Sequence, residues 1–201
     1  MAFPVVKKIR RALGLPAVSA NILRRVGTSD ELLYEAVKAN VNKNDNAFYN
    51  LLHTARAIRS GANYIGASLE GAQLLEMGTS RLPGLPFIML LQGVEKYVAN
   101  NIFAVDDDMS ESYANLIGMT FAGFHDDTPE RIESAITWEQ AVDGAKRAKL
   151  RKGRFENHSP VPAEEIDLPD ASIDVVVSLA VLEHVRRPDA VLANSYRILR
   201  P

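Results

Sequence analysis

The stretch Leu168-Pro-Asp-Ala-Ser-Ile-Asp-Val-Val-Val-Ser-Leu-Ala-Val-Leu-Glu-His-Val185 decides the fold of this chain. It begins with a tight turn, continues as an apolar, β-branched run from Ile173 to Ser178, and ends in a second turn or short helix that carries Glu183 and His184. Such a run is typical of a parallel strand that is buried on both faces. Polar residues directly after it mark the carboxyl edge of the sheet, where open α/β folds bind their ligands.

Length and composition agree with a soluble α/β domain. The 201 residues are 47% hydrophobic, which is enough to bury a substantial core. A net charge of −2 gives no reason to expect nucleic acid as the main partner, and the absence of cysteine excludes disulfides and thiolate metal sites. No apolar run approaches the roughly 18 residues of a membrane span, and the N-terminus lacks a secretory signal pattern. We therefore expect a cytoplasmic protein.

Residues 1–65 look like a helical extension in front of the main domain. On a helix, residues 3–13 place apolar side chains on one face and the basic Lys7, Lys8, Arg10 and Arg11 on the other. We expect this helix to cap the domain, and the alternative is contact with an anionic membrane or a partner protein. Two more helices are expected, one that starts near residue 28 and one over Ala47 to Ser60.

Residues 66–201 alternate between strand and helix, as a parallel sheet requires. The expected strands are Gln73–Met77, a second one between Lys96 and Val105, a third over Arg154–Asn157, and a fourth over Ile173–Ser178. The expected helices run from Pro83 to Gly93, from Met109 to Phe124, from Pro129 to Lys149, and from Pro188 to Leu199. The basic residues at 146–152 are interpreted as a solvated helix end.

The stretch from Leu168 to Val185 resembles, almost letter for letter, the second half of class I S-adenosylmethionine-dependent methyltransferases. Their usual wording is Leu-Pro-Phe-x-Asp-x-Ser-Phe-Asp-Val-Val, followed by Val-Leu-Glu-His. The resemblance covers roughly residues 72–201. It implies an α/β, Rossmann-like sheet, S-adenosyl-L-methionine as the cofactor, and methyl transfer to a small molecule such as a metabolite, a sugar or a lipid-linked precursor.

The segment Glu76-Met-Gly-Thr-Ser-Arg-Leu-Pro-Gly84 occupies the place of the family's cofactor loop, usually Glu/Asp-x-Gly-x-Gly-x-Gly. Only Gly78 stands in register, because Ser80 and Leu82 replace the next two glycines. By resemblance, Glu76 orders the loop or meets the cofactor's amino group, and Gly78 and Thr79 lie beside its methionine part. Ser80 in this loop and Ser178 at the end of the fourth strand are further candidate cofactor contacts.

The resemblance next implies a carboxylate at the end of the second strand that accepts hydrogen bonds from both ribose hydroxyls. Counting from Gly93 puts Asn101 at that position, which would be a departure from the family. Alternatively, Ile102-Phe-Ala-Val105 is the strand and Asp106 is its terminal acid. We favour Asp106, because four apolar residues ahead of an acid fit a buried parallel strand.

The segment Pro162 to Asp170 aligns without a gap on the family's Asp-Ala-Glu-x-Leu-Pro-Phe-x-Asp. Ala163 and Glu164 match, and the backbone N–H of Ala163 would face the adenine ring. Pro162 departs from the family's aspartate, so the side-chain contact to the adenine amino group is missing. His184 is the candidate catalytic residue, because it would follow the fourth strand close to the reacting groups. The other histidines show no metal-ligand spacing, so no metal site is expected.

In the family, a run like Tyr196–Pro201 is usually followed by further strands, so we expect an incomplete sheet with the fourth strand at its edge. An open apolar edge favours self-association, and we expect little methyl transfer from these 201 residues alone. The missing glycines and Pro162 also support an alternative from another class. In that alternative, the chain is a non-catalytic, methyltransferase-like module for binding or scaffolding.

Overall fold

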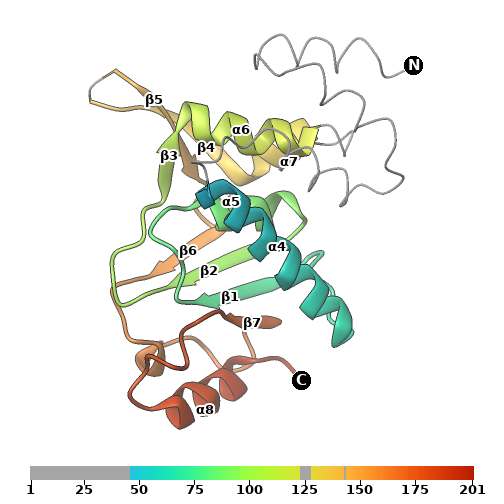
Figure 1. Cartoon of the computed structure of the whole chain (residues 1–201), viewed down its shortest axis with the longest axis vertical. Coiled ribbons are helices and arrows are strands. Elements are labelled where there is room, and N and C mark those ends of the chain that lie inside the picture. Colours follow the sequence, from blue (N-terminus) through green and yellow to red (C-terminus); the bar gives the residue numbers. More distant parts are fainter. Residues whose placement is uncertain (1–45, 123–127, 143) are drawn as a thin grey trace.

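The computed structural model describes residues 46–122, 128–142 and 144–201. The helices expected over residues 3–13 and near residue 28 lie outside this range. The elements in chain order are α4 (Asn46–Tyr64), β1 (Gln73–Met77), α5 (Gly84–Leu91), β2 (Lys96–Asn100), β3 (Asp108–Ser110), α6 (Glu111–Ala122), α7 (Thr128–Ala135), β4 (Ile136–Gln140), β5 (Lys146–Leu150), β6 (Phe155–His158), the 3-10 turn η1 (Ala163–Glu165), β7 (Val175–Ser178) and α8 (Pro188–Ile198) (Figure 1).

The centre of the molecule is a four-stranded parallel sheet in the order β6-β2-β1-β7. This sheet confirms the α/β, Rossmann-like fold class. Gln73–Met77 is the first strand as expected, and α4, α5, β6 and α8 lie within a few residues of their predicted ranges. Among the described strands, β7 pairs on one side only, so the predicted edge position of this strand is confirmed.

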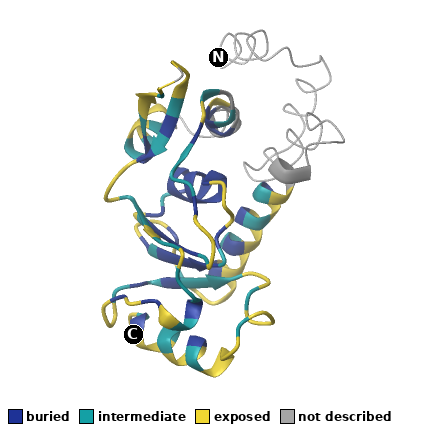
Figure 2. Ribbon diagram, turned by 90° about the vertical axis from the view of Figure 1, so that its left-hand side faces the viewer, coloured by how far each residue is buried: buried dark blue, intermediate teal, exposed yellow. Residues whose placement is uncertain are grey.

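Helices cover the two faces of the sheet with two separate apolar clusters. On one face, α4 and α5 pack against Leu74 of β1 and Tyr97 of β2. On the other, α8 packs Val191 and Ile198 against Leu75, because neighbouring residues of a strand point to opposite faces. Figure 2 shows burial concentrated in the strands and α5. Residues of α4 and α5 lie in the same apolar cluster. The boundary between an N-terminal extension and the main domain at residue 65 stays a prediction.

A second, antiparallel sheet in the order β3-β5-β4 stands between β2 and β6 in the chain. The helix predicted over Pro129–Lys149 is therefore wrong beyond Ala135. The β-branched and aromatic residues of Ile136-Thr-Trp138 favour a strand, and in β5 the buried Ala148 and Leu150 alternate with charged residues. The predicted helix start at Met109 is wrong for the same reason, because Met109 lies in β3.

The basic residues of β5 are paired and are not a solvated helix end. Arg147 bonds to Asp108 at 2.7 Å and Lys149 to Asp107 at 3.4 Å, across the β3–β5 pair. Lys146 lies over the Trp138 ring, 4.3 Å from its centroid. The two ion pairs tie the hairpin to β3, and the contact of Lys146 with Trp138 joins the two strands of the hairpin.

The interpretation of Ile102–Val105 as the second strand is also wrong. The strand is β2, in which Tyr97 to Asn100 are buried between β1 and β6, and it ends at Asn100. Ile102 and Phe103 are 59% and 70% exposed in the loop that follows. No helix among the described residues is both long enough and apolar enough to cross a membrane.

Candidate functional site

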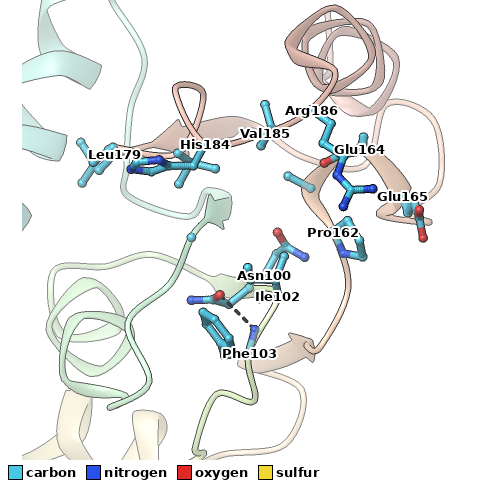
Figure 3. A pocket seen from close by; sticks show the side chains of 15 residues that line it. Asn100, Ile102, Phe103, Pro162, Glu164, Glu165, Leu179, His184, Val185 and Arg186 are labelled. Carbon is cyan, nitrogen blue, oxygen red and sulfur yellow. Dashed lines mark hydrogen bonds between the residues drawn. The ribbon is translucent and has the colours of Figure 1, made fainter.

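A pocket of about 580 Å³ opens at the carboxyl ends of β1 and β2. This is the edge of a parallel sheet at which α/β folds bind ligands, and the volume suits a small molecule. The loops after β1, β2, β6 and β7 form its walls (Figure 3). Its lining residues are Gly78, Asn100, Asn101, Ile102, Phe103, Pro162, Ala163, Glu164, Glu165, Leu179, Ala180, Val181, His184, Val185 and Arg186.

Gly78 makes the sharp turn after β1 and has a φ of +82°. A Cβ added there would lie 2.2 Å from Cγ2 of Val181, so the loop after β7 closes directly over the glycine. The backbone N–H groups of Gly78 and Thr79 both donate to the carbonyl of Asn100 at 2.8 Å. Glycine is therefore required here both for its backbone conformation and for the close approach of Val181.

Thr79 and Ser80 follow this turn but do not line the pocket. Thr79 is buried, and its hydroxyl donates to the carbonyl of Glu76 at 3.0 Å. Ser80 is exposed. The sequence prediction therefore placed the turn correctly, whereas only Gly78 of its three loop residues faces the pocket.

Glu76 lies beneath the pocket and is 4% exposed. Its Oε2 accepts a hydrogen bond of 2.5 Å from the hydroxyl of Tyr97. Burial raises the pKa of Glu76, and the hydrogen bond from Tyr97 opposes that rise. Glu76 is absent from the pocket wall, so its geometry supports a role in ordering the loop.

The two candidates for the ribose position differ sharply in their surroundings. Asn101 follows β2 directly and lines the pocket. Its Nδ2 donates to the carbonyl of Thr79 at 2.6 Å, and its Oδ1 accepts from the N–H of Phe103 at 3.1 Å. Asp106 lies outside the lining and pairs with Arg81 at 3.4 Å. Asn101, and not Asp106, is therefore the candidate that directly follows β2 and lies in the pocket wall.

Pro162, Ala163 and Glu164 form one end of the pocket, as their alignment implied. Ala163 is buried at the start of η1, and Glu164 and Glu165 line the wall beside it. Figure 3 shows the side chain of Arg186 extending toward this end from the loop after β7. This end of the pocket is thus lined by one basic and two acidic residues.

His184 lines the wall made by the β7–α8 loop, with its ring beside Leu179 (Figure 3). Its backbone N–H donates to the carbonyl of Val181 at 2.8 Å, which holds the loop in a turn. Ser178 lies just below, outside the lining, and its buried Oγ has no hydrogen-bond partner among the described residues. Whether these residues contact a ligand stays a prediction.

Sequence reasoning missed the contributions of Phe103, Val181 and Arg186 to the wall. Phe103 was assigned to a strand, Val181 was quoted only as the first residue of the Val-Leu-Glu-His motif, and no motif marks Arg186. The available signal was position: all three belong to loops that follow strands of the sheet.

Comparison with family models matches residues 128–201 to the methyltransferase domain. A comparison with curated proteins found no match. The matched segment contains β6, β7 and α8, which supply half of the strands of the parallel sheet and the helix on one of its faces. Residues 128–201 are thus similar to the methyltransferase domain, and the parallel sheet in the order β6-β2-β1-β7 agrees with the Rossmann-like fold of class I S-adenosylmethionine-dependent methyltransferases.

Proposed function

We propose that the pocket binds S-adenosyl-L-methionine and that the protein transfers its methyl group to a small-molecule acceptor. The match of residues 128–201 to the methyltransferase domain supports methyl transfer in general. The observation that carries the finer proposal is the pocket of about 580 Å³ at the carboxyl ends of β1 and β2, lined by Gly78 and by Ala163. Both residues come from segments that resemble the family's cofactor motifs, and Ala163 also lies within the matched residues 128–201.

The position and the size of the pocket support this cofactor. It lies at the expected sheet edge, its volume falls in the roughly 300–1,000 Å³ range of small-molecule sites, and Gly78 supplies the tight turn. Two polar contacts are not offered. Pro162 has no side-chain acceptor for the adenine amino group, and the amide of Asn101 is already bonded to backbone groups. We therefore expect weaker binding than the family's full motif would give.

The bound cofactor would supply a sulfonium methyl group as the electrophile. The chain's own contribution would be to hold the acceptor in line and to exclude water. Phe103 and Leu179 offer apolar surface for this purpose, and His184 shares the wall with Leu179. If the acceptor must lose a proton, His184 is the residue that we propose as its base. The proposed acceptor is a metabolite, a sugar or a lipid-linked precursor.

The second candidate function is a non-catalytic, methyltransferase-like module for binding or scaffolding. It is favoured by the contact of Val181 with Gly78, which fills the space above the glycine turn. In this reading, the fold is retained while the loop after β7 covers the cofactor site. Binding of the cofactor separates the two candidates.

The test is calorimetric titration with S-adenosylmethionine, S-adenosylhomocysteine and NAD. Ile102→Ala removes an apolar side chain from the pocket wall, and Leu82→Ala removes one of similar exposure outside it. We expect the two S-adenosyl ligands to bind and NAD not to bind. Ile102→Ala should weaken the binding of both S-adenosyl ligands, whereas Leu82→Ala should leave it unchanged. A wild-type chain that binds none of the three would favour the non-catalytic module.

Further proposals concern location and partners. We propose a cytoplasmic protein that self-associates through the open edge of β7. We propose that residues 3–13 cap the domain, with contact to an anionic membrane as the alternative. Deletion of residues 1–16 should then lower the melting temperature. If residues 3–13 instead bind anionic membranes, the deletion should abolish co-sedimentation with anionic liposomes and leave the melting temperature unchanged. Multi-angle light scattering should detect a dimer or larger species.

A further inference from the structure

Asn100 and Asn101 lie at the point where three loops of the pocket meet. In the sheet, Asn100 is opposite Met77 of β1 on one side and His158 of β6 on the other. The dipeptide therefore ends the strand that separates the two neighbouring walls. Asn100 is buried, whereas Asn101 is half-buried and lines the pocket.

The polar groups of both asparagines form hydrogen bonds with these loops. The carbonyl of Asn100 accepts from two N–H groups of the turn after β1, and its Nδ2 donates to the carbonyls of His158 and Val161 at 3.2 and 2.8 Å. The carbonyl of Asn101 accepts from the N–H of Val161 at 2.9 Å. With the bonds of its side chain to Thr79 and Phe103, the dipeptide joins the loops after β1, β2 and β6.

The side chain of Asn101 cannot replace a carboxylate at this position. A carboxylate has two acceptor oxygens, whereas an amide has one, and its nitrogen only donates. One of the two lone pairs of that oxygen already accepts from the N–H of Phe103 at 3.1 Å. A hydrogen bond to a neutral oxygen is also roughly half as strong as one to a charged oxygen. In place of a carboxylate, the pair of ribose hydroxyls would therefore meet at most one further acceptor site, and that site carries no charge.

Asn157 in β6 repeats the same arrangement away from the pocket wall. Its Nδ2 donates to the carbonyl of Val105 at 2.8 Å, and its Oδ1 accepts from the N–H of Ser159, two residues on, at 3.0 Å. Asparagine favours this bond to the backbone two residues further along. The repetition indicates that the geometry of Asn101 is a way of holding loops.

We propose that Asn101 is a positioning residue that joins the loops after β1 and β2, and that the pocket holds its nucleoside ligand without a charged side-chain acceptor for the ribose hydroxyls at the end of β2. The second half of this inference rests on the proposed function. Asp106 does not supply the acceptor, since it lies outside the pocket lining and faces Arg81. The site should therefore discriminate little between ribose and 2′-deoxyribose.

The probes are S-adenosylhomocysteine and its 2′-deoxy analogue, titrated by calorimetry against the full chain. We expect the two dissociation constants of the wild type to agree within about threefold, since no charged hydrogen bond is lost with the 2′-hydroxyl. Asn101→Ala should weaken both ligands by the same factor, because it loosens the wall without removing a ribose contact. Asn157→Ala is the matched control and should leave both affinities unchanged.

Hydrogen exchange reads the loop contacts independently of any ligand. The amide of Phe103 should exchange faster in Asn101→Ala, and that of Ser159 in Asn157→Ala. A wild-type preference for the ribose form of more than about tenfold that disappears in Asn101→Ala would show a direct ribose contact and overturn the inference. Unchanged exchange at Phe103 would overturn the positioning role. A chain that binds neither probe would overturn the proposed function and the inference about the ribose hydroxyls. Hydrogen exchange at Phe103 would still test the positioning role of Asn101.

Discussion

The hydroxyl of Tyr97 on β2 donates a hydrogen bond of 2.5 Å to the carboxylate of Glu76 on β1, and both side chains are buried. Burial raises the pKa of Glu76, and burial together with the neighbouring carboxylate raises the pKa of Tyr97 well above its ordinary value. An acid is thus held inside the apolar layer between the sheet and α5, two residues before Gly78, which turns the chain into the pocket wall.

Glu76→Gln should flatten the dependence of stability on pH. Because the pKa of Glu76 is raised in the folded state, that state holds the proton more tightly than the unfolded chain does. Stability should then be highest below the ordinary pKa and fall as the pH rises through the folded-state pKa. Glutamine keeps an acceptor for Tyr97 without the charge. Urea unfolding at a series of pH values measures this, and wild-type and variant curves that run parallel would contradict it.

Tyr97→Phe is the companion variant for the same pair. It removes the hydrogen bond that lowers the pKa of Glu76 and leaves the burial that raises it. The decline of stability with rising pH should therefore extend to higher pH than in the wild type. A profile shifted the other way would mean that Tyr97 does not stabilise the charged carboxylate.

Gly78→Ala should be more destabilising than Gly66→Ala. Both glycines have positive φ, +82° and +75°, so alanine costs about 1–2 kcal/mol of backbone strain at either site. At Gly66 an added Cβ meets nothing within 4 Å, whereas at Gly78 it meets Val181 at 2.2 Å. The difference between the two losses in free energy of unfolding measures the clash with Val181, and chemical denaturation of both variants gives that difference.

Val181→Ala should relieve that clash. The double variant with Gly78→Ala should show a favourable coupling of about 0.5–3 kcal/mol, and the pairing with Gly66→Ala should show none. Additive effects in both cases would mean that the loop after β7 does not press on the glycine turn.

The elements that sequence patterns predicted well have strong local signals. Gln73–Met77 is a short apolar run that ends at a glycine, and α8 starts with a proline in its first turn. The parallel sheet followed from such runs in alternation with helical segments. The same reasoning brought Gly78, Ala163 and His184 to one pocket, although they are up to 106 residues apart in the sequence.

The failures concern features that depend on pairing with distant residues. Residues 136–150 carry interspersed apolar and charged residues that suit an amphipathic helix as well as a hairpin, and only the pairing of Thr137 with Lys149 and its neighbours decides between them. The end of β2 is likewise set by the register of Met77 with Asn100. From the sequence alone, without knowledge of that register, the apolar run Ile102–Val105 before Asp106 fitted a buried strand better than the residues before Asn101.

Asp174→Asn should destabilise the attachment of α8 to the sheet. Oδ2 of Asp174 accepts from the backbone N–H of Gln73 at 2.7 Å, and both of its oxygens bond to Arg200. Asparagine keeps one acceptor and turns a donor toward these donors, so we expect a loss of about 1–3 kcal/mol in thermal or chemical unfolding. Asp170→Asn is the control, because that acid pairs with Arg197 while 76% exposed, and it should cost under about 1 kcal/mol. Equal losses would contradict the prediction.

Pro162→Asp should tighten the binding of S-adenosylhomocysteine. Pro162 has φ −59° and ψ 146°, an extended conformation that aspartate also adopts, so the new carboxylate would stand at the pocket end without backbone strain. It would accept from the adenine amino group, and part of the gain would be lost to repulsion from Glu164 in the same wall. We expect about tenfold tighter binding, equivalent to about 1.4 kcal/mol. Calorimetry with the inosine counterpart, which lacks the amino group, should show no gain, and Pro162→Ala should improve neither ligand. An equal gain for both nucleosides would mean that the carboxylate acts through overall charge, and the adenine amino group would then have to lie elsewhere.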